Sequence, residues 1–203
     1  MSASIPARIA IITCSTRSPR VGPKVADFVQ KVLAARPLAP TPARAHDLVP
    51  IDLRDWHLPL FDEPTIPSQI HAAADYAWPH TRAWSAEVAS YAAFIFVCPQ
   101  YNWGYPAALK NAIDYLYHEW QGKPAMIVSY GGRGGGKAAE QLRQVLLGVR
   151  MRVAETMPGL ALKPEEVMKA AALEGHLGPQ AEHLWLSEED VILKAFSELV
   201  ELL

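Results

Sequence analysis

Residues 92–98 have the sequence AAFIFVC, and residues 99–105, which follow them, have the sequence PQYNWGY. The first run is wholly apolar and rich in aromatic and β-branched side chains, which is typical of a strand buried on both faces of a sheet. The second run contains Pro99 and Gly104, which favour a loop directly after the strand. A strand buried on both faces predicts a parallel sheet with helices on either side.

The rest of the chain alternates in the same way between apolar runs and amphipathic patterns. Four further strands are predicted, at 8–14 (RIAIITC), 46–53, 124–129 (PAMIVS) and within 151–162. Helical patterns are predicted from Pro23, at about 80–90, from Pro106 over 106–120, over 137–149 and after Ser187, where Asp190 completes an N-cap pattern. Residues 163–186 carry no clear pattern. Strands that alternate with helices predict an α/β fold, a flavodoxin-like, doubly wound, five-stranded parallel sheet with strand order 2-1-3-4-5.

Composition and charge narrow the class of protein. Hydrophobic residues make up 50% of the 203 residues and charged residues 20%, which is typical of a globular chain. The net charge of −2 offers no basic field for nucleic acid. No window is long and apolar enough for a membrane span, and residues 1–7 lack the features of a signal peptide. We therefore expect a cytoplasmic protein in which Cys14 and Cys98 are reduced.

No linker, charge block or repeat divides the chain. Residues 1–203 are therefore expected to form a single domain, with its core at about 8–160 and a C-terminal extension and helix at 163–203. Residues 54–79 contain four prolines and are long for a loop without structure, which indicates a binding role or a short hidden helix. Glu63, within this segment, is interpreted as a surface residue.

Polar residues follow the first predicted strand, where a ligand is expected in a sheet of this kind. Ser15, Thr16, Arg17 and Arg20 combine hydroxyl groups and two cations with the start of a helix, a combination that favours an anion such as a phosphate. The alternative is a solvated polar loop.

Aromatic residues follow the third predicted strand. Tyr101, Trp103 and Tyr105 lie within one short loop, and exposed aromatic side chains gathered in this way indicate a bound ring or partner. Pro99 shapes the turn, and Gly104 allows close approach to the backbone. The alternative is that the aromatic side chains simply pack the loop down.

A glycine-rich loop, YGGRGGG at 130–136, follows the fourth predicted strand. Gly131, Gly136 and Lys137 match part of a nucleotide-binding P-loop, but Ala138 stands where Ser or Thr would hold magnesium. We therefore interpret the loop as backbone amides that lie against a flat ring. The seven histidines are scattered, and no G-x-S-x-G motif is present, so neither a metal site nor a catalytic side chain is predicted.

The run from Pro99 to Ala138, together with STRSPR at 15–20 and Trp84-Ser85, closely resembles the NAD(P)H-dependent FMN reductases, especially the fungal-type quinone and flavin reductases. The resemblance covers about 8–160. It implies a flavodoxin-like fold, non-covalent FMN, NADPH or NADH as co-substrate, and a quinone, flavin, azo dye or metal-oxide anion as acceptor. It also implies a homodimer, with a tetramer as a further possibility.

The resemblance also implies roles for individual residues. Ser15, Thr16, Arg17 and Arg20 would hold the FMN phosphate; Pro99 would shape the loop from which Gln100, Tyr101, Asn102 and Trp103 contact the ribityl chain and the isoalloxazine; and Tyr130, Gly131 and Gly132 would lie at the edge of the ring. One position departs from the family pattern, because Cys14 stands where the first loop usually has glycine.

Three functions remain open on this basis. The first is an oxidoreductase in which FMN carries the chemistry and donor and acceptor bind in turn, in a ping-pong mechanism. The second is an FMN-binding redox-sensing module that regulates a partner protein. The third, a flavodoxin-type electron carrier, is disfavoured because such carriers are strongly acidic and this chain is not.

The aromatic residues of the predicted helix 106–120 suggest a place for the dimer contact. Tyr115, Tyr117 and Trp120 cannot all face the same core as Leu109 and Ile113 on a helix of about 3.6 residues per turn. We therefore predict that they lie at a twofold interface. The alternative is that they pack beneath residues 54–79.

Overall fold

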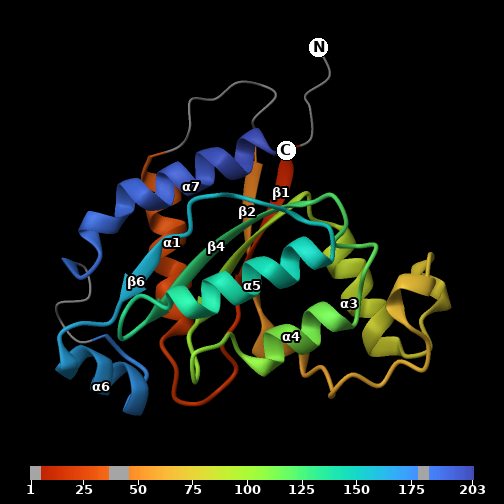
Figure 1. The fold of residues 1–203 in the computed structure, drawn as a ribbon, viewed down its shortest axis with the longest axis horizontal. Helices are drawn as coiled ribbons and strands as arrows, with labels where there is room; N and C mark the ends of the chain where they lie inside the picture. The colour runs from red at the N-terminus through yellow and green to blue at the C-terminus, as the bar shows by residue number, and fades with distance from the viewer. Residues whose placement is uncertain (1–5, 37–45, 178–182) are drawn as a thin grey trace.

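A computed structural model describes residues 6–36, 46–177 and 183–203 (Figure 1). Its strands are β1 (Ala7–Thr13), β2 (His46–Asp52), β3 (Ala93–Pro99), β4 (Pro124–Gly131), β5 (Arg152–Val153) and β6 (Gly159–Ala161). The pairs are all parallel and the order is β2-β1-β3-β4-β5, with β6 also paired to β4. The predicted order is confirmed, and the strand predicted within 151–162 is divided into two short pieces.

The helices are α1 (Gly22–Ala35), α2 (Leu53–Trp56), α3 (Pro79–Ala89), α4 (Ala107–Asp114), α5 (Gly136–Gly148), α6 (Glu165–Leu173) and α7 (Glu189–Glu201). Alternate residues of the strands supply two cores. Ile12 and Phe96 face α3, α4 and α5, whereas Ile11 and Ile95 face α1 and α7. This division confirms the doubly wound arrangement and explains why β3 is buried along its whole length.

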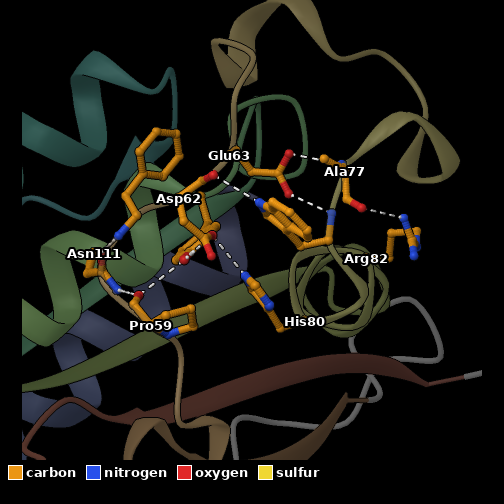
Figure 2. Close-up of polar contacts among 10 residues, drawn as sticks. Pro59, Asp62, Glu63, Ala77, His80, Arg82 and Asn111 are labelled. Atoms are coloured by element: carbon orange, nitrogen blue, oxygen red, sulfur yellow. Dashed lines mark hydrogen bonds and ion pairs between the residues drawn. The ribbon is translucent and has the colours of Figure 1, made fainter.

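Segment 57–78, which follows α2, is ordered by polar contacts (Figure 2). Glu63 is buried, and its carboxylate accepts hydrogen bonds from the backbone N–H groups of Ala77, at 2.9 Å, and Trp78, at 3.1 Å. The interpretation of Glu63 as a surface residue is therefore wrong, because a charged side chain is buried where it satisfies backbone donors. The expected short hidden helix exists as α2, and two 3₁₀ turns follow, at Pro67–Gln69 and Ala73–Asp75.

The placement of the aromatic residues after α4 corrects one prediction. The helix ends at Asp114, so the helical spacing assumed for 106–120 does not continue. Tyr115 and Trp120 are fully buried. The Tyr115 hydroxyl donates to Pro59 O beneath segment 57–78, and Trp120 packs against Phe94 in the core. Neither side chain is available to a partner subunit; only Tyr117 is half-buried.

The start of the last helix also differs from the prediction. Ser187 lies in a 3₁₀ turn, Leu186–Glu188, and provides no N-cap; α7 begins at Glu189. Two largely exposed ion pairs, from Arg36 at the end of α1 to Glu189 and Asp190 and each at 2.9 Å, lie at this end of α7. Among the described helices none is long and apolar enough to cross a membrane.

Candidate functional site

The loops that follow β1, β3 and β4 meet at the carboxyl edge of the sheet and enclose one cavity of about 290 Å³. Most of the residues predicted for the site lie around it. Those that line it are Arg17, Arg20, Pro99, Gln100, Tyr101, Tyr130, Gly131 and Gly132. The cavity lies where the order of the strands reverses, as expected for ligands of doubly wound sheets.

Ser15 lies at the base of the first loop, against the start of α1. It is fully buried; among the described residues no hydrogen bond of good geometry reaches its Oγ, and the Tyr130 hydroxyl is the polar group that lies beside it. A Cβ on Gly22 would come within 2.0 Å of this oxygen, so only glycine fits there. No side chain caps the first turn of α1. Free N–H groups at a helix start and a buried hydroxyl are suited to an anionic ligand.

The two arginines of this loop have different surroundings. Arg20 forms a two-pronged ion pair with Asp52 at the end of β2, with N···O distances of 2.5 and 2.8 Å, and donates to Ser15 O. The hydrogen bond with Asp52 raises the pKa of Arg20 above its ordinary value. Arg17 is exposed, donates to the Ala172 carbonyl at 3.0 Å and lies 5.9 Å from the Tyr101 ring centroid. Arg20 thus fixes the loop, whereas Arg17 has no acidic partner among the described residues and can bind an anion.

The loop after β3 is a tight turn. Tyr101 and Gly104 exchange two backbone hydrogen bonds, of 2.8 and 2.9 Å. Asn102 and Trp103, between them, have positive φ values of 45° and 71°. Such a conformation is unfavourable for residues other than glycine, and it is retained where the surrounding structure or a ligand requires it.

This turn separates the predicted aromatic residues. Trp103 projects into solvent with 64% of its surface exposed, and neither it nor Asn102 lines the 290 Å³ cavity. Tyr101 forms part of the cavity wall. Tyr105 packs against the core, so for this residue the alternative of packing the loop down is the correct one.

Glycines have two different uses in the loop after β4. Gly134 and Gly135 have φ values of +84° and +80°, and a Cβ on either would come within 2.9 Å of backbone atoms. The backbone conformation and the close packing therefore require glycine at both positions. Gly131 and Gly132 have no such constraint and border the cavity. Burial raises the pKa of Tyr130, so its phenol stays protonated beside Ser15.

Thr16 is separated from the other predicted residues of its loop. It lines a neighbouring cavity of about 310 Å³ with Arg54 and His57. A larger cavity, of about 690 Å³, lies between α1 and the residues that lead into α7. It contains none of the predicted residues. Two of its lining residues, Arg36 and Leu177, directly precede the undescribed residues 37–45 and 178–182, and we draw no functional conclusion from it.

The sequence analysis missed one wall of the 290 Å³ cavity. Leu162, Met168, Ala171 and Ala172 line it from α6 and the residue that follows β6. Residues 163–186 carry no clear pattern of helix or strand in the sequence. The signal available in the sequence was the helical spacing of Val167 and Ala171, which are the buried residues of α6.

Cys14 directly follows β1, Cys98 is near the end of the neighbouring strand β3, and both are free and buried. Burial is the main reason that the pKa of Cys14 is raised, and a hydrogen bond with Cys98 raises it further. Within the described ranges no three His, Cys, Asp or Glu side chains gather as metal ligands would.

Sequence comparisons identify relatives over most of the chain. The profile of the NADPH-dependent FMN reductase family matches residues 7–160. An NAD(P)H-dependent FMN reductase from Nectria sp. is 40% identical over 200 residues, which are 97% of each chain. The NAD(P)H-dependent FMN reductase LOT6 of Saccharomyces cerevisiae is 45% identical over 165 residues, covering 77% of this chain and 80% of the relative.

Solved structures show the same fold at lower identity. The flavoenzyme NAD(P)H:(acceptor) oxidoreductase FerB from Paracoccus denitrificans aligns with a TM-score of 0.63 and 21% identity over 95% of this chain and 98% of its own. Flavodoxin 1 from Bacillus cereus aligns with a TM-score of 0.54 and 15% identity over 97% of this chain and 99% of its own. With a parallel sheet in the flavodoxin-like order and a family match that spans its strands, this chain belongs to the NADPH-dependent FMN reductase family.

Proposed function

We propose that this chain transfers two electrons from NAD(P)H to quinones, free flavins or similar small acceptors, with FMN held in the cavity at the carboxyl edge of the sheet. Membership of the family makes it an oxidoreductase that uses FMN and NAD(P)H. The observation that carries the proposed site has three parts: Arg17 lines the cavity, the Ser15 hydroxyl is buried at the base of the same loop, and the Tyr101 ring forms another wall of the cavity. A phosphate would be bound by the Arg17 guanidinium and the Ser15 hydroxyl, and a flat apolar ring would pack against the Tyr101 ring.

The residues present fit FMN, and we assign them accordingly. Ser15 and Arg17 bind the phosphate, Thr16 approaches it from the neighbouring cavity that it lines, and Arg20 contributes by fixing the loop through Asp52. Pro99, Gln100 and Tyr101 contact the ribityl chain and ring within the cavity, and Tyr130, Gly131 and Gly132 border the ring edge. Asn102 and Trp103, which do not line the cavity, contact the part of the ring that extends beyond it. FMN, when bound, supplies the redox chemistry. In the loops after β3 and β4, backbone N–H groups that donate to no described backbone carbonyl, such as those of Asn102, Trp103 and Gly132, serve as fixed hydrogen-bond donors to it.

A visible spectrum followed by anaerobic reduction tests this proposal. The purified protein is expected to be yellow, with flavin absorption that bleaches when NADPH or NADH is added without oxygen. Quinone added afterwards should restore the absorption. Protein that binds no flavin after incubation with FMN would contradict the site assignment.

The kinetic order of binding tests whether donor and acceptor share one place. If they bind in turn, double-reciprocal plots of rate against NADPH concentration at several quinone concentrations are parallel. Intersecting lines would show a ternary complex and contradict the ping-pong mechanism. Flavin that bleaches with NADPH but passes its electrons to quinone only over many minutes would favour the alternative, a redox-sensing module.

We also propose that the protein is a homodimer, with a tetramer as a further assembly. Since Tyr115 and Trp120 are buried, the contact is assigned to the exposed apolar side chains of Leu60, Ile66 and Trp78 on segment 57–78. Light scattering should give at least twice the chain mass of 22.3 kDa at micromolar concentration. Leu60→Glu should lower that mass, and a monomeric parent protein would overturn the proposal.

A further inference from the structure

Residues 162–177 cover one side of the proposed flavin site. Figure 1 shows α6 below β6, at the same end of the sheet as the loop between β1 and α1. Leu162, Met168, Ala171 and Ala172 line the cavity, whereas the family profile ends at residue 160. This wall therefore comes from a part of the chain to which the family match assigns no role.

Segment 162–177 rests directly on the loops that are expected to hold the ligand. Met168 Sδ is 3.0 Å from the position that a Cβ on Gly132 would occupy. Gly175, with a φ of +73°, packs so closely that a Cβ there would be 3.0 Å from Arg20 N and 3.1 Å from Pro19 Cβ. A change in the loops after β1 and β4 thus acts on α6.

One contact links α6 to the cation best suited to bind phosphate. Arg17 donates from Nη1 to the Ala172 carbonyl, at 3.0 Å. That carbonyl is a neutral acceptor, whereas a phosphate adds the attraction of opposite charges and can accept two hydrogen bonds from the guanidinium at once. A phosphate in the loop after β1 would therefore draw the Arg17 guanidinium away from Ala172.

The volume of the cavity also indicates that α6 moves when a phosphorylated flavin binds. Its volume is about 290 Å³. Ligand pockets have volumes of about 300–1,000 Å³, so this one is at the small end of the range. A flavin with its ribityl phosphate needs more room, and of the lining elements α6 is a short helix, Glu165–Leu173, in which only Val167 and Ala171 are buried.

We propose that α6 is a cap on the ligand site: Met168 limits the width of the cavity beside Gly132, and the Ala172 carbonyl competes with the ligand phosphate for Arg17. Binding of a phosphorylated flavin then loosens α6, whereas a flavin without phosphate leaves it in place. This inference rests on the proposed function, because it needs a phosphorylated flavin in the cavity. Met168 and Ala172 would then control how the flavin enters the site and how tightly it is retained.

Hydrogen exchange of α6, measured by mass spectrometry on the full chain, tests the contact without any ligand. In flavin-free protein Arg17→Ala should speed exchange of the amides of 167–175 about tenfold, the effect of losing one hydrogen bond to a charged group. Exchange in α5 should not change. Unchanged exchange in α6 would overturn the proposal, whether or not the protein binds flavin.

Two flavins then separate the phosphate from the ring. Added to flavin-free wild-type protein, FMN should bring exchange of 167–175 close to the rate of Arg17→Ala, and riboflavin should not. If FMN slows this exchange, or if both flavins act alike, the competition for Arg17 is wrong. Failure of FMN to bind at all would contradict the proposed function and would be detected separately, by the absence of flavin absorption after gel filtration.

Substitution of Met168 tests its place in the cavity wall. Met168→Ala should speed FMN uptake by flavin-free protein several-fold, measured by quenching of flavin fluorescence. Leu173→Ala is the matched control, since Leu173 is on the same helix but 72% exposed, and it should not change the rate. Equal rates for the two variants would show that Met168 does not limit the cavity.

Discussion

Segments 57–78 and 162–177 both leave the sheet at its carboxyl edge, but they are held by different kinds of contact. Segment 57–78 is fixed by side chains with no expected part in ligand binding, such as Glu63 and Tyr115. Segment 162–177 buries Val167 and Ala171 in the core, and its other face contacts Arg17, Gly132 and the backbone of Arg20, which belong to the proposed site. The first segment is therefore expected to keep its structure whatever is bound, and the second to respond to the ligand.

Loss of the buried carboxylate should produce the largest effect. Glu63→Ala removes the acceptor of two charge-assisted hydrogen bonds, each worth about 1.5–3 kcal/mol, and should lower the free energy of unfolding by about 3–4 kcal/mol. Urea denaturation measures the change. Asp75→Ala, an exposed position in the same segment, should stay within about 0.5 kcal/mol. If Glu63→Ala also abolished FMN binding in folded protein, the two segments would not be independent.

Substitution of the two arginines should separate ligand binding from stability. Arg17→Ala should weaken FMN binding roughly 10–150-fold, since a hydrogen bond to a charged group contributes about 1.5–3 kcal/mol, and leave unfolding almost unchanged. Arg20→Ala should weaken binding and also lower the free energy of unfolding by about 2–3 kcal/mol, because Asp52 loses its partner. Lys31→Ala, an exposed cation on α1, is the control. Tight FMN binding by Arg17→Ala would refute the phosphate assignment.

A smaller effect is expected at the base of segment 57–78. The Tyr115 hydroxyl bonds to Pro59 O and Asp62 Oδ1, so Tyr115→Phe should lower the free energy of unfolding by about 0.5–1.5 kcal/mol. Tyr117, two residues on, makes no hydroxyl hydrogen bond with any described residue, and Tyr117→Phe should be neutral. If both variants lowered the free energy of unfolding equally, the Tyr115 hydroxyl would not be one of the groups that fix segment 57–78.

The smallest effect should come from the surface of α6. Lys169 and Glu165 form an ion pair at 2.9 Å, with both side chains largely exposed. Exposed pairs contribute about 0–1 kcal/mol, so Lys169→Ala should change neither stability nor FMN affinity measurably. A clear rise in hydrogen exchange of α6 in this variant would show that surface charge, rather than Arg17, holds the helix.

The residues of the sheet and of its three loops were predictable from the sequence because their signals are local. An apolar run such as 92–98 is typical of a strand buried on both faces, and the alternation of strands and helices specifies the parallel order. The hydroxyls and arginines of 15–20 and the glycines of 131–136 lie at strand ends, which parallel pairing brings to one edge. Those signals, with the family resemblance, were sufficient for the fold and for most of the cavity lining.

What the sequence did not reveal depends on contacts between distant residues. Glu63 is buried only because Ala77 and Trp78 return to it, and Tyr115 and Trp120 are buried only because the chain turns after Asp114. The sequence alone does not distinguish the role of Arg17 from that of Arg20, because both are cations in the same loop. In the structure Arg20 forms an ion pair with Asp52, at the end of β2, which fixes the loop. Arg17 instead donates to the carbonyl of Ala172, which is 155 residues further along the chain. Burial and pairing of polar groups are properties of the assembled fold, because each depends on which acceptor the tertiary structure brings within hydrogen-bond distance.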